Sequence, residues 1–354
     1  MNALQRFAAL GRGEPIDRLP CVPIIGNTAA RVIGVPVRAI RNDPRLLAEA
    51  QVAAYRLFGY DVIRVFTDLY VQAEAMGARV KVPEDETAYL DAPAIATLSA
   101  IDGLRPLNPH RDGLLPVHLE AMRRVVDAVG HEVPVTGALC APFTTASLLI
   151  GAEQIVRLTL KDPEAVHRLC RIALESCLAY AEAIIDSGAT PSLTDPMASS
   201  TVISPRQFRE FAYPYLKELI AYIHARGKSV TLHICGRTAK VWEAMADAGA
   251  DCLSIDNEAS LADARAFVGD RVRLMGNVRP SEVMLQGTPA DVRKGVIECI
   301  RAAHDNPKGY IVASGCSLPT ETPFANIHAM MDTVREIGWP VDAGKLKFVE
   351  EPVT

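Results

Sequence analysis

Eight short runs rich in β-branched residues recur along the chain, and amphipathic segments separate most of them. Such alternation is typical of βαβ units, which place parallel strands in one sheet. Eight is the strand number of a (β/α)8 barrel, and 354 residues are enough for one barrel with additions. The expected strands are 21–25, 61–66, 134–139, 192–194, 229–235, 251–256, 271–276 and 310–314.

Residues with helical spacing of apolar side chains fill most of the intervals between these strands. Several segments begin with proline directly after Asp, Ser or Thr, a favourable start for a helix. The expected helices are 44–58, 163–187, 205–225, 237–248, 261–268, 289–304 and 323–337. Residues 67–133 break the rhythm, which predicts an insertion after the second strand with a short hairpin and a helix over 117–129. We therefore expect a single domain over 1–354, a TIM barrel with an N-terminal extension and this insertion.

The charge pattern argues against several function classes. The net charge is −5 and no run of Lys or Arg appears, so a nucleic-acid surface is not expected. No uncharged apolar run approaches the roughly 18 residues of a membrane span, and the N-terminus has no apolar segment typical of a secretory signal. We expect a cytoplasmic protein with mostly reduced cysteines.

The sequence VTLHICG places His233 and Cys235 at the end of an expected strand. Residues two apart on a strand point to the same side, so both side chains can converge on one point. Cys316 follows the last expected strand, and the carboxyl ends of barrel strands share one rim. Two sulfurs and one imidazole suit zinc, with a fourth position left open for catalysis. The alternative is ordinary: a cysteine is often a small buried hydrophobe, and a histidine a packed core residue.

Polar residues follow other expected strands and are weaker candidates. Asp68, Glu74 and Asp195 are candidate catalytic carboxylates. Asp68 or Glu74 could act as proton relay, substrate contact or fourth zinc ligand; the alternative is a helix-start Asp68 and a solvated Glu74. For Asp195, which precedes a proline, the alternative is a turn. Asn277 is a candidate cofactor-binding residue, or a cap for the next segment. Asp256 or Glu258 is a candidate hydrogen-bond partner for a zinc-binding histidine, or a helix cap.

Several longer motifs resemble the uroporphyrinogen decarboxylase superfamily. They are RFAALGRGEPIDRLP near the N-terminus, GALCAPFTTASLLIG (137–151), TDPMASSTVISPRQFREFAYPYLK (194–217), HICG (233–236), MGNVRP (275–280) and SGCSLPTETPFANI (314–327). The HICG and SGC motifs are most similar to the branch of methylcobalamin:coenzyme M methyltransferases and the zinc methyltransferases of corrinoid-dependent O-demethylase systems.

That resemblance implies a TIM barrel, a zinc ion on His233, Cys235 and Cys316, and methyl transfer between a corrinoid such as methylcobalamin and a zinc-activated thiol or methoxy substrate. The D-x-H-x-x-G signature of cobalamin binding is absent from the sequence. We therefore expect the corrinoid to arrive on a partner protein.

The alternative within the superfamily is a porphyrinogen decarboxylase of the uroporphyrinogen type. Such enzymes have an Arg-rich segment after the first strand that resembles M-R-Q-A-G-R and holds the substrate carboxylates. This chain has CVPIIGNTAARVIG there, with Arg31 alone, and it has Cys316 where the decarboxylase resembles G-H-G. A third possibility is a zinc or corrinoid scaffold without turnover, which predicts a saturated four-ligand site.

Overall fold

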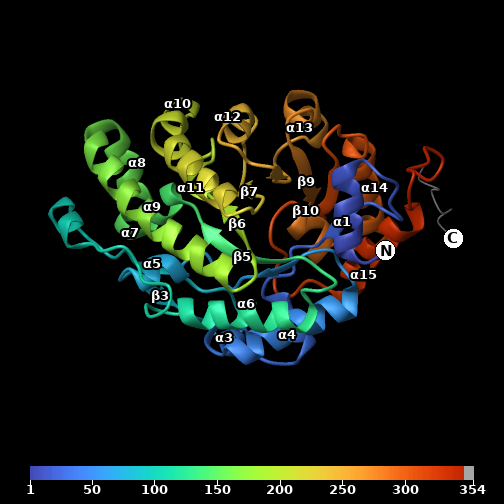
Figure 1. Ribbon diagram of the computed structural model, residues 1–354, viewed down its shortest axis with the longest axis horizontal. Coiled ribbons are helices and arrows are strands. Elements are labelled where there is room, and N and C mark those ends of the chain that lie inside the picture. The colour runs from blue at the N-terminus through green and yellow to red at the C-terminus, as the bar shows by residue number, and fades with distance from the viewer. Residues whose placement is uncertain (347–354) are drawn as a thin grey trace.

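The computed structural model describes residues 1–346, and its centre is a curled sheet of eight parallel strands wrapped by helices (Figure 1). The strands lie in the order β1-β10-β9-β8-β7-β6-β5-β2. They are β1 (Cys21–Val22), β2 (Ile63–Val65), β5 (Val135–Cys140), β6 (Thr190–Thr194), β7 (Thr231–Ile234), β8 (Cys252–Ile255), β9 (Arg273–Val278) and β10 (Tyr310–Ser314). All eight predicted strands are present, so the predicted (β/α)8 barrel is confirmed.

The two strands at the ends of this order, β1 and β2, are joined at their amino ends by one backbone hydrogen bond and by the side chain of Asp61. The Asp61 backbone N–H donates to the Cys21 carbonyl (2.9 Å), and the Asp61 carboxylate accepts the Cys21 N–H (2.6 Å). Arg6 and Arg18 both donate to the same carboxylate. All three charged side chains are buried. Asp61 therefore links the first and second strands of the chain and closes the sheet.

Most of the helices lie where the sequence pattern predicts them. They are α1 (Ala3–Arg12), α2 (Thr28–Val32), α3 (Val37–Asn42), α4 (Pro44–Phe58), α5 (Val71–Ala75), α6 (Leu115–Val129), α7 (Pro142–Ile150), α8 (Ala152–Lys161), α9 (Pro163–Asp186), α10 (Pro205–Gln207), α11 (Tyr213–Ala225), α12 (Trp242–Asp247), α13 (Leu261–Val268), α14 (Pro289–Ala303) and α15 (Phe324–Ile337). Short 3₁₀ or π turns cover Leu98–Gly103, Pro196–Ala198, Phe208–Ala212 and Pro280–Leu285.

Two of the predicted helices differ from the structure. The segment 205–225 is interrupted by the π turn Phe208–Ala212, because Pro214 has no N–H to donate to the carbonyl of Glu210. The segment 237–248 is helical only from Trp242 onward. The pattern also gave no sign of α7, because this helix is apolar and buried on nearly all sides and so lacks a helical period.

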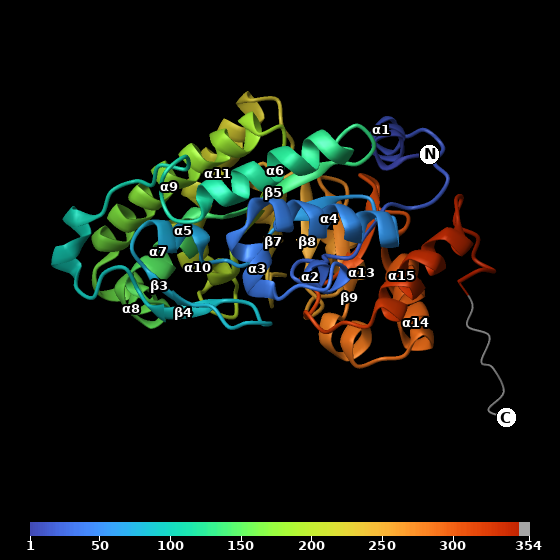
Figure 2. The same ribbon diagram turned by 90° about the horizontal axis from the view of Figure 1, so that it is seen from below.

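The insertion after the second strand contains the predicted hairpin, formed by β3 (Arg79–Lys81) and β4 (Tyr89–Ala92). This hairpin lies outside the eight-stranded sheet (Figure 2). The helix expected at its end is α6, which packs against α4 on the outside of the barrel. Within residues 1–346, no helix is both long and apolar enough to cross a bilayer.

Candidate metal centre

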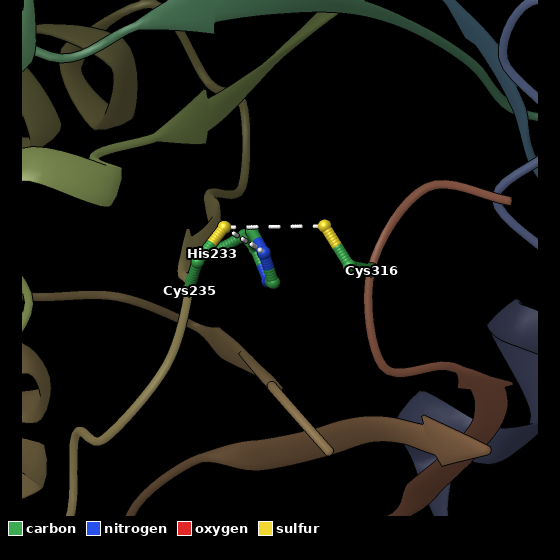
Figure 3. A group of neighbouring side chains, drawn as sticks. All are labelled: His233, Cys235 and Cys316. Atoms are coloured by element: carbon green, nitrogen blue, oxygen red, sulfur yellow. Dashed lines mark hydrogen bonds between the residues drawn. The ribbon is translucent and has the colours of Figure 1, made fainter. Parts of the chain in front are cut away.

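The structure brings the three predicted metal ligands together at the carboxyl end of the barrel. His233 lies on β7, Cys235 follows that strand, and Cys316 follows β10. Their ligand atoms all lie within 4.8 Å of one another. Figure 3 shows the two sulfur atoms facing each other across a short gap, with the imidazole beside Cys235. His233 is buried and both cysteines are half-buried.

The distance between the two sulfurs fits a tetrahedral zinc ion. Cys235 Sγ lies 3.9 Å from Cys316 Sγ, and His233 Nε2 lies 3.1 Å from Cys235 Sγ. Two sulfurs bound tetrahedrally to zinc at about 2.3 Å lie about 3.8 Å apart. The sulfur spacing and the chemistry of the donor set therefore both suit this ion.

His233 is held in the tautomer that a metal ligand needs. Its Nδ1 lies 3.2 Å from the carbonyl oxygen of Ser254 and 3.1 Å from the Ser254 hydroxyl oxygen. Because a carbonyl only accepts, Nδ1 carries the hydrogen and Nε2 keeps a free lone pair toward the cysteines. Sequence reasoning proposed Asp256 or Glu258 for this role and missed Ser254. The sequence carries no signal for this contact, because Ser254 is placed beside His233 only by the register between β7 and β8.

The two thiol groups lie within hydrogen-bond distance of each other, and this contact shifts both pKa values. A hydrogen bond from Cys235 lowers the pKa of Cys316; burial opposes this shift and His233 reinforces it. The same hydrogen bond, together with burial, raises the pKa of Cys235. The site therefore favours one negative charge on its pair of sulfurs, which suits a cation.

A glycine next to each cysteine lets the chain pack closely at the site. Gly236 has a φ of +73°, and a Cβ there would lie 2.8 Å from Thr201 Oγ1. A Cβ on Gly315 would lie 2.7 Å from the backbone nitrogen of Asn257. Real Cβ contacts are almost never below 3.0 Å. The positions of Cys235 and Cys316 therefore depend on the absence of a side chain at the neighbouring residue.

Asp68 and Glu74 lie near the rim but are both bound to one arginine. Arg41 donates to Asp68 and to Glu74, each at 2.7 Å. The buried Asp68 carboxylate also accepts the Thr67 hydroxyl and the Tyr70 N–H. These contacts join α3 to the segment after β2. The catalytic roles of Asp68 and Glu74 stay predictions, and the structure gives both carboxylates a packing role.

Asp195 and Asn277 also end strands at this rim. Asp195 is fully buried; one carboxylate oxygen accepts the Thr144 N–H (2.9 Å) and hydroxyl (2.6 Å), and the other has no partner. Burial raises the pKa of Asp195 to about 7. The Asn277 amide donates to the carbonyls of Asp256 and Ala259. The catalytic role of Asp195 and the cofactor-binding role of Asn277 stay predictions.

Known proteins resemble this chain over nearly its whole length. It is 28% identical to the methylcobamide:CoM methyltransferase MtaA of Methanosarcina barkeri, over 92% of this chain and 95% of that protein. It is 29% identical to a uroporphyrinogen decarboxylase of a Synechococcus species, over 92% of this chain and 94% of that protein. A solved structure of a methyltransferase from Methanosarcina mazei superposes with a TM-score of 0.87 at 26% identity, covering 95% of this chain and 99% of that one.

Identity alone does not separate these two activities, since the two percentages are almost equal. The family model for uroporphyrinogen decarboxylase (URO-D) matches residues 2–337. That match covers the barrel and all three candidate metal ligands. The chain therefore belongs to the uroporphyrinogen decarboxylase (URO-D) family.

Proposed function

We propose that this chain is a zinc-dependent methyltransferase, which moves a methyl group between a corrinoid on a partner protein and a thiol or methoxy substrate. The observation that carries the proposal is the open, three-ligand site of His233, Cys235 and Cys316. Among the described residues, these three alone form a group able to hold a metal. Three protein ligands leave one position for a substrate, which is the pattern of catalytic zinc.

Residues of the chain orient the ligands and supply the donor atoms that a cation needs. Ser254 orients the imidazole of His233, and the two cysteines supply sulfur and negative charge. A zinc ion bound by them would favour the thiolate form of a substrate thiol, or polarise the oxygen of a methyl ether. The site lies at the rim formed by the carboxyl ends of the strands, where a corrinoid could approach.

The proposed transfer is an in-line displacement. In one direction the substrate sulfur attacks the methyl carbon, a carbon–sulfur bond forms and the cobalt–carbon bond breaks. The electron pair stays with cobalt, which passes from Co(III) to Co(I). In the other direction Co(I) takes the methyl group from a methoxy substrate, and the phenolate or alkoxide leaves.

The site favours this reaction over porphyrinogen decarboxylation. A porphyrinogen carries several carboxylates, which need several cations. Arg31 is the arginine in the segment after the first strand, and its guanidinium donates to the carbonyls of Thr320 and Thr322. That guanidinium therefore already has hydrogen-bond partners in the protein's own backbone.

The test uses zinc-loaded protein with free methylcobalamin and a series of thiols, followed by absorbance. Conversion of methyl-Co(III) to Co(I) is the expected result. The same protein with Co(I) cobalamin and methoxyarenes tests the reverse direction. Cys316→Ala should lose bound zinc and methyl transfer together, whereas Cys170→Ala, at a buried cysteine of α9, should keep both.

Two outcomes would contradict the proposal. One is full methyl transfer by zinc-free Cys316→Ala protein. The other is release of carbon dioxide from a porphyrinogen by metal-free protein, which would support the decarboxylase instead.

A further inference from the structure

A hollow of about 490 Å³ lies at the amino ends of the barrel strands, on the face opposite the candidate metal centre. We call it the amino-face pocket. The segments that lead into β7, β8, β9 and β10 line it. One lining residue, Ser229, precedes His233 by four residues, and four residues of extended chain span about 13 Å. The pocket is therefore separate from the metal centre, and its volume is within the roughly 300–1,000 Å³ typical of ligand sites.

A second cavity, of about 250 Å³, lies in the barrel interior and extends from His233 to the amino ends of the strands. Barrel interiors are normally filled by layers of branched side chains, so this space is unusual. Ser229, Asp251 and Arg273 line both the interior cavity and the amino-face pocket. A ligand in the amino-face pocket would therefore lie at the end of the interior cavity that is remote from the metal centre.

Three cationic side chains line the amino-face pocket. Arg271 and Arg273 come from the chain that leads into β9, and Lys308 comes from the turn before β10. Asp251 is the one acidic residue in the lining. The lining thus carries three positive charges and one negative charge, an excess of two positive charges, although the whole chain has a net charge of −5.

Two of these cations have no anionic partner within the protein. Arg271 donates to Asp247 at 2.6 Å, in a partly exposed ion pair. Arg273 is half-buried and Lys308 is exposed, and within residues 1–346 neither forms an ion pair. The Arg273 Nε atom is also buried without a hydrogen-bond partner. Because a buried donor without an acceptor is costly, an anion in the pocket would be stabilised here.

Asp251 does not neutralise these two side chains, because its carboxylate has other partners. Its Oδ2 atom accepts the Val230 N–H at 2.7 Å and lies 2.8 Å from His224 Nε2. These contacts hold Asp251 toward the chain before β7 and toward α11. The positive charge of Arg273 and Lys308 therefore remains available to a ligand.

Two guanidinium groups and one ammonium group around a single hollow suit a phosphate group. Guanidinium groups bind phosphate oxygens in pairs, and a lysine ammonium adds a compact charge. A phosphate ester carries about −1.5 to −2 charges at pH 7, which matches the excess of positive charge in the lining. A nucleic acid fits less well, because these cations surround a hollow instead of forming a stripe.

We propose that the amino-face pocket binds the phosphate group of a small phosphorylated molecule, held by Arg271, Arg273 and Lys308. The Ser229 hydroxyl can donate a further hydrogen bond. The inference goes beyond the proposed function and does not depend on it, because none of the candidate metal ligands lines this pocket.

The test measures binding by calorimetry on zinc-loaded protein, in a buffer free of phosphate and sulfate. The probes are inorganic phosphate, glycerol 3-phosphate and acetate. We expect saturable binding of at least one phosphate compound, and binding of acetate at least about 10-fold weaker, because a carboxylate brings one charge and fewer acceptor oxygens. The first two probes distinguish the free ion from an ester.

Lys308→Met should weaken phosphate binding about 10- to 100-fold, the range for a hydrogen bond to a charged group, and Arg273→Met should weaken it at least as much. Lys308 is exposed, so its replacement should leave the fold intact. The matched control is Lys161→Met, which removes the same charge from an exposed lysine of α8, outside the pocket. This control should keep phosphate binding.

Cys316→Ala should also bind phosphate as the unaltered protein does, which excludes binding to the metal. Four results would overturn the proposal: no saturable binding of either phosphate compound, acetate binding as tight as phosphate binding, equal losses in Lys308→Met and Lys161→Met, or loss of phosphate binding in Cys316→Ala. The first two need no variant. Absence of methyl transfer together with intact phosphate binding would contradict only the proposed function.

Discussion

At the scale of single residues, the candidate site depends on the glycines next to Cys235 and Cys316 as well as on the three ligands. Gly315 precedes Cys316 and packs against the backbone of Asn257. In Gly315→Ala the new methyl group must push this loop outward and carry the Cys316 sulfur with it. We expect zinc affinity to fall about tenfold or more, as when supporting groups around a metal are altered. Competition with a coloured chelator measures this.

Gly103→Ala is the control for this change, because a Cβ at Gly103 meets no atom within 4 Å. Its zinc affinity should equal that of the unaltered protein. An unchanged affinity in Gly315→Ala would show that the loop tolerates the shift.

Asp195 should make the stability of the protein depend on pH. Burial raises its pKa in the folded state to about 7, against about 4 in an unfolded chain. The folded protein therefore holds this proton more tightly, and the associated stability is present below about pH 4 and is lost as the pH rises toward 7. In Asp195→Asn the neutral amide cannot titrate, so this loss disappears.

Urea denaturation at pH 5 and pH 8 tests this expectation. Between these values the unaltered protein should lose about 1–3 kcal/mol more unfolding free energy than Asp195→Asn. Equal losses in the two proteins would mean that Asp195 is ionised in the folded state at pH 5.

The three ligands could be predicted from the sequence because Cys and His are typical zinc ligands. All three also lie at or just after the carboxyl ends of two predicted strands, which meet at one rim. The residues that position these ligands could not be predicted in the same way. Ser254 lies beside His233 only because of the register between β7 and β8.

At the scale of elements, the join between β1 and β2 is the point where the barrel depends on ion pairs. The Asp61 carboxylate accepts hydrogen bonds from Arg6 of α1, from Arg18 in the segment before β1, and from the backbone N–H of Cys21. Asp61→Asn leaves two buried guanidinium groups without their shared charge. Because breaking a buried pair costs about 3–5 kcal/mol, we expect a loss of that size in unfolding free energy.

Chemical denaturation at constant pH measures this loss. Glu218→Gln is the control, because its ion pair with Arg171 is exposed and should be worth at most about 1 kcal/mol. A loss no greater than that of the control would show that backbone packing, and not Asp61, closes the barrel.

The strands were predictable because each is a short apolar run between clear turns, and buried parallel strands have that composition. The ends of the helices around residues 205–225 and 237–248 were harder to predict. The break in the hydrogen-bond pattern follows from the missing N–H of Pro214, and neither this break nor the late start at Trp242 changes the apolar period. The helix α7 lies in the interior, where periodicity is lost.

At the scale of the whole molecule, the number and order of the strands followed from the sequence, but the hollow interior did not. Periodicity tells which side chains point inward and says little about whether they fill the space. Small residues on β5, β6 and β8 opposite larger ones on β1, β9 and β10 leave the space open. That contrast exists only once the strands are arranged in a ring.

The hollow interior also reaches the face of the barrel opposite the metal centre. Its lining runs from His233 to Ser229 and Asp251 at the other face. Ser229 and Asp251 are exposed, so a ligand in this cavity would keep contact with solvent at the amino end of the strands even if a partner covered the rim as proposed.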